Sequence, residues 1–274
     1  MMNSQYSKTI KIQGLNTHYL EAGSGEPLVL VHGGGAGADA IGNWTALIEL
    51  LKNHFHIFAV DMVGFGHTEI PESPDYIFSQ QSRDNHLIEF IKKIDIGPVY
   101  LVGNSMGGLT SLAAARKHPQ LIKKLVLMGS AGIQMTFSPE LLSILHYDYS
   151  IAGMQKIVEG LTGPNYVVPE GLIEYRHSLT TSEKAKNAYQ GIIDWQRKQG
   201  GLHIDEELIK SITVPTLVVS GKNDLVVPLS STYKFLELIP HSWGTIMPEC
   251  GHWPMIEKPN EFAKVLKTFL IEEI

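Results

Sequence analysis

The chain has 274 residues, of which 43% are hydrophobic and 18% charged, and this length suits one large domain with a sizeable core. The formal net charge of −6 excludes a broad basic surface, so we expect neither a nucleic-acid partner nor attachment to a membrane surface. A lone cysteine excludes an internal disulfide, no apolar run is long enough to span a bilayer, and Met1–Gln5 lacks the apolar stretch of a signal peptide, so we expect a cytoplasmic protein.

The first half of the chain alternates apolar strand patterns with helical ones. Continuous apolar runs such as Leu28–Val31 are typical of strands that are buried on both faces. Regular alternation of strand and helix predicts an α/β fold, in which a mostly parallel sheet carries helices on both sides. The strands predicted here are Thr9–Gln13, Thr17–Glu21, Leu28–Val31, His56–Val60, Val99–Val102 and Leu125–Met128. The helices predicted here are Trp44–Lys52, Phe78–Lys93 and one that runs from Met106 through Ala115.

The alternation stops after Gly132. Residues 134–206 show helical patterns without a strand, and we expect Leu141, Leu142 and Leu145 on one buried helix face. We predict that 134–206 form a helical cap, and that 1–133 and 207–274 form the core. Ligands bind beyond the carboxyl ends of the strands in such sheets, so a cap there would cover the ligand. The elements predicted after the cap are a strand at Thr216–Ser220, a helix at Ser230–Leu238, a strand at Thr245–Met247 and a helix at Asn260–Leu270.

One serine lies between a predicted strand and a predicted helix, in the sequence Gly103-Asn104-Ser105-Met106-Gly107. In α/β-hydrolases such a strand–turn–helix holds a nucleophilic serine in a strained turn above the sheet. The two glycines allow the strand and the helix to approach each other closely, because neither carries a Cβ atom. A glycine-rich chain also produces this pattern by chance, so the predicted context is what favours Ser105 as a nucleophile.

A serine nucleophile needs a base to take its proton and an acid to orient that base. In α/β-hydrolases the order along the chain is serine, acid, histidine. Asp224 follows the predicted strand Thr216–Ser220, and His252 precedes the final predicted helix. We therefore predict a catalytic triad of Ser105, Asp224 and His252, while Asp224 as a simple turn residue remains an alternative.

Two further reactive side chains are interpreted as structural. Asp61 precedes Ser105 in the chain, which is the wrong order for the acid, so we expect it to cap the turn Val63–Gly66. Cys250 lacks a nucleophile turn of its own, and we expect it to be a small buried filler. No group of His, Cys, Asp and Glu has metal-ligand spacing, so we predict neither a metal nor a cofactor.

The negative charge that develops during acyl transfer needs two backbone donors. We predict that the N–H of Met106 supplies one, and that the glycine-rich loop His32–Gly37 supplies the other through Gly34, with Gly35 as its neighbour. A phosphate-binding loop is disfavoured because the Gly-Lys-Ser/Thr ending is missing. A dinucleotide fingerprint is disfavoured because no helix pattern follows at once.

Taken together, these motifs resemble the meta-cleavage product hydrolases, carbon–carbon bond hydrolases of aromatic degradation within the α/β-hydrolase superfamily. The resemblance spans nearly the whole chain, and the segment Trp195–Leu202 is most similar to the carbazole-pathway branch. The matching motifs are His32-Gly33-Gly34-Gly35-Ala36-Gly37, Gly42-Asn43-Trp44, Asp61-Met62-Val63-Gly64-Phe65-Gly66, Gly103-Asn104-Ser105-Met106-Gly107-Gly108, Leu127-Met128-Gly129-Ser130-Ala131-Gly132, Val214-Pro215-Thr216-Leu217, Gly221-Lys222-Asn223-Asp224 and Gly251-His252-Trp253.

The resemblance implies a small anionic substrate of the 2-hydroxy-6-oxohexa-2,4-dienoate type, cleaved by water between C5 and C6. It also implies a homo-oligomer, with a dimer as the simplest case. The residues that it implies in dienoate binding are Gly35, Asn43, Asn104, Arg176 and Trp253, with Arg176 pairing with the carboxylate or oxo group. A guanidinium fork suits an anionic dienoate.

For four of these residues a role outside substrate binding remains an alternative. Asn43 would cap a helix starting at Trp44, Asn104 would brace the turn at Ser105, Trp253 would only pack, and Arg176 would be solvated. Two other functions also remain open. A carboxylesterase would use the same triad without the acid-binding set, and a non-catalytic receptor would use the fold without the triad.

Overall fold

An eight-stranded sheet forms the centre of the computed structural model, which describes residues 4–271. The strands are β1 (Ser7–Ile12), β2 (Leu15–Ala22), β3 (Glu26–Val31), β4 (Phe55–Val60), β5 (Val99–Asn104), β6 (Ile122–Met128), β7 (Thr216–Gly221) and β8 (Ser242–Met247). Their order in the sheet is β1-β2-β4-β3-β5-β6-β7-β8. Strand β2 pairs antiparallel with β1 and with β4. All the other neighbouring pairs, in the order β4-β3-β5-β6-β7-β8, are parallel. The predicted mostly parallel α/β sheet is confirmed.

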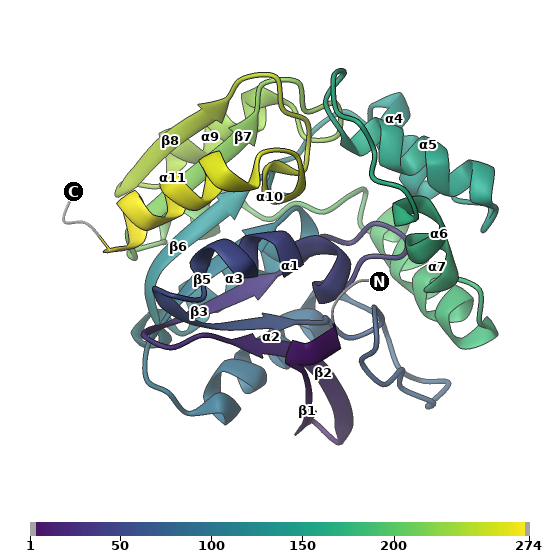
Figure 1. Cartoon of the computed structure of the whole chain (residues 1–274), viewed down its shortest axis with the longest axis horizontal. Coiled ribbons are helices and arrows are strands. Elements are labelled where there is room, and N and C mark those ends of the chain that lie inside the picture. Colours follow the sequence, from purple (N-terminus) through teal and green to yellow (C-terminus); the bar gives the residue numbers. More distant parts are fainter. Residues whose placement is uncertain (1–3, 272–274) are drawn as a thin grey trace.

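Helices cover both faces of this sheet (Figure 1). The core helices are α1 (Ala40–Leu51), α2 (Gln80–Ile94), α3 (Met106–Lys117), α8 (Glu206–Lys210), α9 (Leu229–Leu238), α10 (Pro254–Glu257) and α11 (Pro259–Ile271). Helices α10 and α11 pack against α1 on one face, while α3 packs against α2 and α8 on the other. The central strands are therefore buried on both sides, and Leu28–Val31 has no exposed surface.

Four helices between β6 and α8 lie on one side of the molecule in Figure 1: α4 (Pro139–Leu145), α5 (Ile151–Leu161), α6 (Leu172–Ser178) and α7 (Glu183–Lys198). Residues 134–206, all of which the structure describes, contain no strand. The side chains of Ser138, Ser150 and Ser182 begin α4, α5 and α7 by accepting a hydrogen bond from a backbone N–H of the first turn. The division into a cap at 134–206 and a core at 1–133 and 207–274 stays a prediction.

Several predicted details are wrong, and each error has a local cause. Helix α1 begins four residues before Trp44, because the Asp39 side chain caps it by accepting from Gly42 N at 2.7 Å. Asn43 therefore lies inside α1, and the capping alternative for it is wrong. Leu142 was expected on the buried face of α4 but is 37% exposed, because α4 buries Leu141 and Leu145 at the four-residue spacing of a helix.

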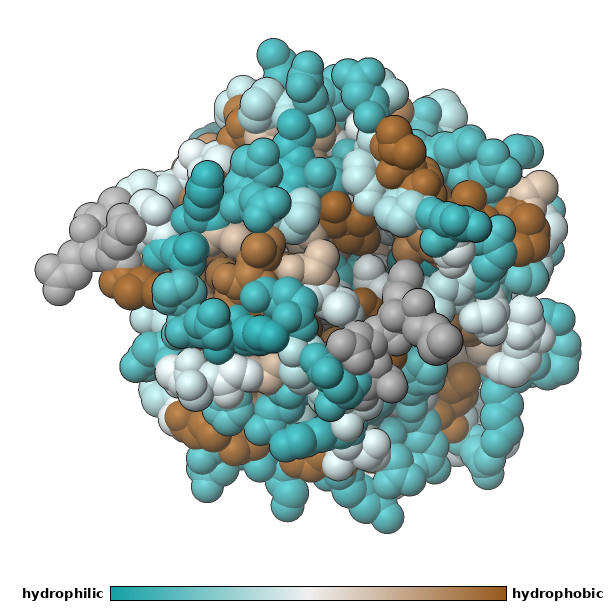
Figure 2. Space-filling view, in the orientation of Figure 1, coloured by the Kyte–Doolittle hydropathy of each residue, from teal (hydrophilic) through white to brown (hydrophobic). Residues whose placement is uncertain are grey.

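Most apolar side chains are enclosed between the sheet and its helices. Figure 2 shows one face of the molecule, on which hydrophilic residues predominate and hydrophobic ones occur in small scattered groups. Within residues 4–271, no helix combines the length and the apolar composition that crossing a bilayer requires.

Candidate active site

Ser105 occupies the sharp turn between β5 and α3. Its backbone angles, φ 55° and ψ −121°, are strained for a residue with a side chain. The neighbouring glycines make this turn possible. A Cβ atom on Gly107 would lie 2.2 Å from the His32 carbonyl oxygen, and one on Gly103 would lie 2.4 Å from the Gly107 carbonyl oxygen. The predicted strand–turn–helix around Ser105 is therefore present, with the close approach that the glycines allow.

Asp224 and His252 form a buried pair. The Asp224 Oδ2 atom lies 2.7 Å from His252 Nδ1, and the two side chains are 0% and 2% exposed. The Asp224 Oδ1 atom accepts from the backbone N–H groups of Val226 at 2.8 Å and Val227 at 2.9 Å. Because a carboxylate only accepts, His252 Nδ1 donates, and Nε2 stays available as a base. The arrangement is that of an imidazole oriented by a fixed acid.

One pocket gathers nearly all of the predicted site residues. It encloses a space of about 490 Å³ that is partly open to solvent. Of the predicted set, its lining contains Gly34, Gly35, Asn43, Asn104, Ser105, Met106, Arg176, His252 and Trp253. Asp224 lies behind His252. No hydrogen bond joins Ser105 to His252 within residues 4–271, and contacts between a nucleophile and its base often tighten only when substrate binds.

The glycine-rich loop lies directly against the turn at Ser105. A Cβ atom on Gly33 would lie 3.2 Å from the Ser105 Cβ, and one on Gly34 would lie 2.4 Å from the Met106 side chain. The loop thus brings the backbone of Gly34 beside the start of α3. The two predicted oxyanion donors share one wall of the pocket, as an oxyanion hole requires. Their donor role stays a prediction.

Arg176, from α6, is a buried cation in this pocket. It is 1% exposed, donates to the Ala36 carbonyl oxygen at 2.8 Å, and lies 3.5 Å from Asn43 Oδ1. Its guanidinium lies 4.8 Å from the centre of the Trp253 ring. The solvated alternative for Arg176 is therefore wrong. No carboxylate in the described part of the chain forms an ion pair with it, Nε has no partner there, and burial lowers its pKa to about 10.

Asn104 combines two features that the sequence left as alternatives. Its Nδ2 atom donates to the Met128 carbonyl oxygen at 3.0 Å and lies 3.4 Å from that of His252, so the side chain braces the turn. Its Oδ1 atom has no partner among the described residues, and Asn104 also lines the pocket. Bracing and substrate contact are thus compatible at this position.

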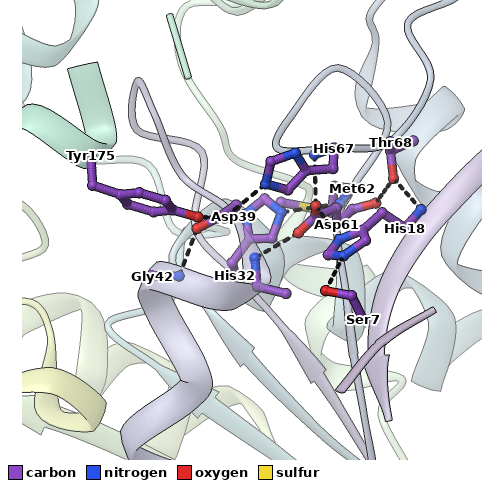
Figure 3. A network of polar contacts seen from close by, with 11 residues as sticks. Ser7, His18, His32, Asp39, Gly42, Asp61, Met62, His67, Thr68 and Tyr175 are labelled. Atoms are coloured by element: carbon purple, nitrogen blue, oxygen red, sulfur yellow. Dashed lines mark hydrogen bonds and ion pairs between the residues drawn. The ribbon is translucent and has the colours of Figure 1, made fainter. Parts of the chain in front are cut away.

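A buried polar network ties α1 to the end of β4 and to α6 (Figure 3). Asp61 Oδ1 accepts from Ala40 N at 2.6 Å, while Oδ2 accepts from His67 N at 2.8 Å and lies 2.7 Å from His18 Nδ1. The structural interpretation of Asp61 is confirmed, although it joins three segments instead of capping Val63–Gly66. Its buried carboxylate forms its hydrogen bonds within the fold, away from Ser105.

Tyr175 connects this network to the pocket. Its hydroxyl donates to Asp39 Oδ2, across from α6 to the cap of α1, as Figure 3 shows. Burial and the nearby Asp61 raise the pKa of Asp39 to about 7. Because Tyr175 precedes Arg176 in α6, this contact fixes the helix that carries the buried cation.

Sequence reasoning missed two residues that hold His252. Gly129 has φ 50°, and a Cβ atom there would lie 3.0 Å from His252 Nδ1. Glu257 accepts from Gly163 N at 2.7 Å and from Gly251 N at 3.0 Å, which binds the loop before His252 to the segment after α5. A glycine directly after a buried strand was a visible signal for Gly129, whereas nothing local marked Glu257. Cys250 is buried as predicted, and burial raises the pKa of its thiol.

Comparison with known proteins shows to which family the chain belongs. The alpha/beta hydrolase fold family matches residues 26–181 and 174–259. A 2-hydroxy-6-oxo-6-(2'-aminophenyl)hexa-2,4-dienoic acid hydrolase from Metapseudomonas resinovorans is 46% identical over 258 residues, which cover 94% of this chain and 88% of that protein. The chain belongs to the meta-cleavage product hydrolases of the α/β-hydrolase family. The predicted family, fold and enzyme class are thereby confirmed.

Solved structures agree with this assignment of the hydrolase. A serine hydrolase involved in carbazole degradation superposes with a TM-score of 0.88 and 44% identity, covering 96% of this chain and 98% of that one. A meta-cleavage product hydrolase from Pseudomonas fluorescens superposes with a TM-score of 0.90 and 31% identity, covering 97% and 98%. This hydrolase acts on a small molecule.

Within residues 4–271 no group of three or more His, Cys, Asp or Glu side chains is arranged to hold a metal ion.

Proposed function

We propose that this hydrolase cleaves the C5–C6 bond of 2-hydroxy-6-oxohexa-2,4-dienoates, releasing 2-hydroxypenta-2,4-dienoate and a carboxylic acid. Ser105 is the proposed nucleophile, His252 its base, and Asp224 the acid that orients His252. The names of the relatives support this substrate class, since they describe hydrolases of such dienoates.

The observation that carries the proposal is the buried charge of Arg176, which has no carboxylate partner among the described residues and lines the same pocket as Ser105. A buried cation without a carboxylate partner is costly, and an anionic ligand removes that cost. The dienoate carries a carboxylate at the end remote from C6, so it spans from Arg176 to the nucleophile. A simple ester would supply no anionic partner for the guanidinium, which disfavours the carboxylesterase alternative.

The geometry supports a two-stage reaction. First, the dienolate takes a proton at C5 and becomes a ketone, with His252 handling that proton. Ser105 then attacks the C6 carbonyl while His252 accepts its hydroxyl proton, and the N–H groups of Met106 and Gly34 stabilise the oxygen that becomes negative. The C5–C6 bond breaks toward C5, where the conjugated dienolate accommodates the electron pair. Water, deprotonated by His252, then attacks the acyl-Ser105 ester; the bond between C6 and Ser105 Oγ breaks, Ser105 regains its proton from His252, and the acid product carries the second oxygen from water.

The test compares two substrates. The 6-phenyl dienoate is yellow, so its cleavage is followed as loss of visible absorbance, and p-nitrophenyl acetate reports ester hydrolysis. We expect the purified hydrolase to cleave the dienoate with the higher kcat/KM, and Ser105→Ala to abolish turnover. Rapid cleavage of the ester with no effect on the dienoate would establish the carboxylesterase instead. A ligand response that survives Ser105→Ala would favour the receptor.

We further propose that the protein is cytoplasmic and forms a homo-oligomer, with a dimer as the simplest case. Its lone, buried Cys250 supports a reducing compartment, because the chain cannot form an internal disulfide. Light scattering of the purified protein tests the oligomer, and a monomer at all concentrations would contradict it.

A further inference from the structure

The pocket continues past Ser105 into a second compartment. Ser105, Leu141, Gln196, Leu202 and Val226 line both compartments and so mark the junction between them. Arg176 and Asn43 lie only in the first. The walls that belong to the second alone are largely apolar, with Ile133, Met135, Phe137 and Val227 among them. If the carboxylate end of the dienoate lies at Arg176 and C6 at Ser105, the group attached to C6 enters the apolar compartment.

Gln196 is a polar exception on an apolar helix face. Tyr189, Ile192, Ile193 and Gln196 lie on one face of α7 at helical spacing, and all four are buried. Gln196 is 5% exposed, and its side-chain amide makes no hydrogen bond within the described part of the chain. An amide that lines a pocket without a protein partner is available to a polar group of a ligand. Its position at the junction means that a ligand in the pocket can provide the missing partner.

We infer that Gln196 determines specificity by binding a polar substituent at the ortho position of an aromatic ring attached to C6. This inference rests on the proposed function, because it places C6 at Ser105. The ortho position is the ring position nearest to C6, and so the one that reaches the junction. The para position points away from C6 and from Gln196, toward walls that are apolar apart from His203.

The chemistry of an ortho-amino group fits this placement. The group has two N–H bonds, and the neighbouring C6 ketone oxygen accepts one of them. The second N–H is free to donate to the Gln196 Oε1 atom. An unsubstituted phenyl ring fills the same compartment but leaves the amide without a partner. The hydrolase should therefore favour the ortho-amino substrate over both the phenyl substrate and the para-amino isomer.

The test measures kcat/KM for three dienoates that carry 2'-aminophenyl, 4'-aminophenyl or phenyl at C6. Gln196→Met preserves the length of the side chain and removes the amide. We expect it to lower the ratio of 2'-aminophenyl to phenyl kcat/KM about tenfold, the effect of losing one hydrogen bond. Ile192→Met is the matched control, because Ile192 shares the buried face of α7 and lines neither compartment, and it should leave the ratio unchanged.

Other outcomes distinguish a failure of this inference from a failure of the proposed function. An unchanged ratio in Gln196→Met, or an equal loss on all three substrates, overturns the inference while the proposed function stands. Wild-type enzyme that prefers the 4'-aminophenyl isomer also overturns it, and this measurement does not depend on a variant that folds. Wild-type enzyme that cleaves none of the three dienoates refutes the proposed function and this inference together.

Discussion

Replacing Arg176 with methionine should weaken catalysis on an anionic substrate while leaving the fold nearly as stable. Burial lowers the pKa of Arg176 from 12.5 to about 10. At about 1.4 kcal/mol for each tenfold change, keeping this charge costs on the order of 3 kcal/mol. The variant escapes that cost but loses the hydrogen bond to Ala36 and the contact with Trp253, together worth about 2–4 kcal/mol. We expect the free energy of unfolding to change by no more than about 2 kcal/mol.

The effect on activity should be larger and should depend on the substrate. Charge-assisted hydrogen bonds to a carboxylate are worth about 1.5–3 kcal/mol, so kcat/KM for the dienoate should fall about 10- to 150-fold. Cleavage of p-nitrophenyl acetate, which has no carboxylate, should change by less than about threefold. Arg176→Lys keeps the charge without the guanidinium fork and should lie between the wild type and the methionine variant.

The assay is steady-state kinetics on both substrates, with urea unfolding of each variant as the control for stability. A loss that is equal on the dienoate and the ester would refute the reasoning, because it would make Arg176 a general structural residue. A fall in unfolding free energy well beyond about 2 kcal/mol would refute it as well, since the charge would then be compensated within the fold.

Three further predictions concern Ser105 as the proposed nucleophile, the surroundings of His252 and the polar network. Ser105→Gly should abolish dienoate cleavage and raise the free energy of unfolding by about 1 kcal/mol, because glycine relieves the strain at φ 55°; urea unfolding that shows a loss would contradict this. Gly129→Ala should lower kcat at least about tenfold, because its Cβ would lie 3.0 Å from His252 Nδ1, and unchanged stopped-flow turnover would exclude that contact. Asp39→Asn should alter the pH dependence of stability: the folded-state pKa of Asp39 is raised from 3.8 to about 7, so its ionisation makes the wild type progressively less stable across that interval. The variant should therefore gain stability relative to wild type as pH rises from 4 to 7, as measured by thermal unfolding. A stability difference that does not vary with pH would contradict the raised pKa of Asp39.

The sequence was sufficient to predict those features that depend on neighbouring residues or on their order along the chain. The turn at Ser105 needs small residues on both sides, so Gly103 and Gly107 were informative without any knowledge of the fold. Asp224 and His252 could be chosen from their order along the chain, because the order of strands in such a sheet places both loops at one edge. The sheet followed from apolar runs whose burial on both faces leaves little alternative.

What sequence reasoning missed depends on contacts between distant segments. The start of α1 depends on Asp39, whose carboxylate is also bound by Tyr175 from another helix. The burial of Arg176 depends on Ala36 and Trp253, which are far from it in the chain. The exposure of Leu142 depends on how α4 is rotated about its axis, and a short helix with adjacent leucines does not specify this.

The attachment of His252 to the helical segment bears on how family members can be recombined. Its backbone N–H donates to the Leu161 carbonyl oxygen at 2.8 Å, and Glu257 accepts from Gly163 nearby. Residues 161–163 thus form the junction at which the helical segment is bonded to the loop of His252, the proposed base. Chimeras that exchange helices on the N-terminal side of this junction should inherit new pocket walls with an intact base, whereas crossovers placed within it should yield folded but inactive proteins.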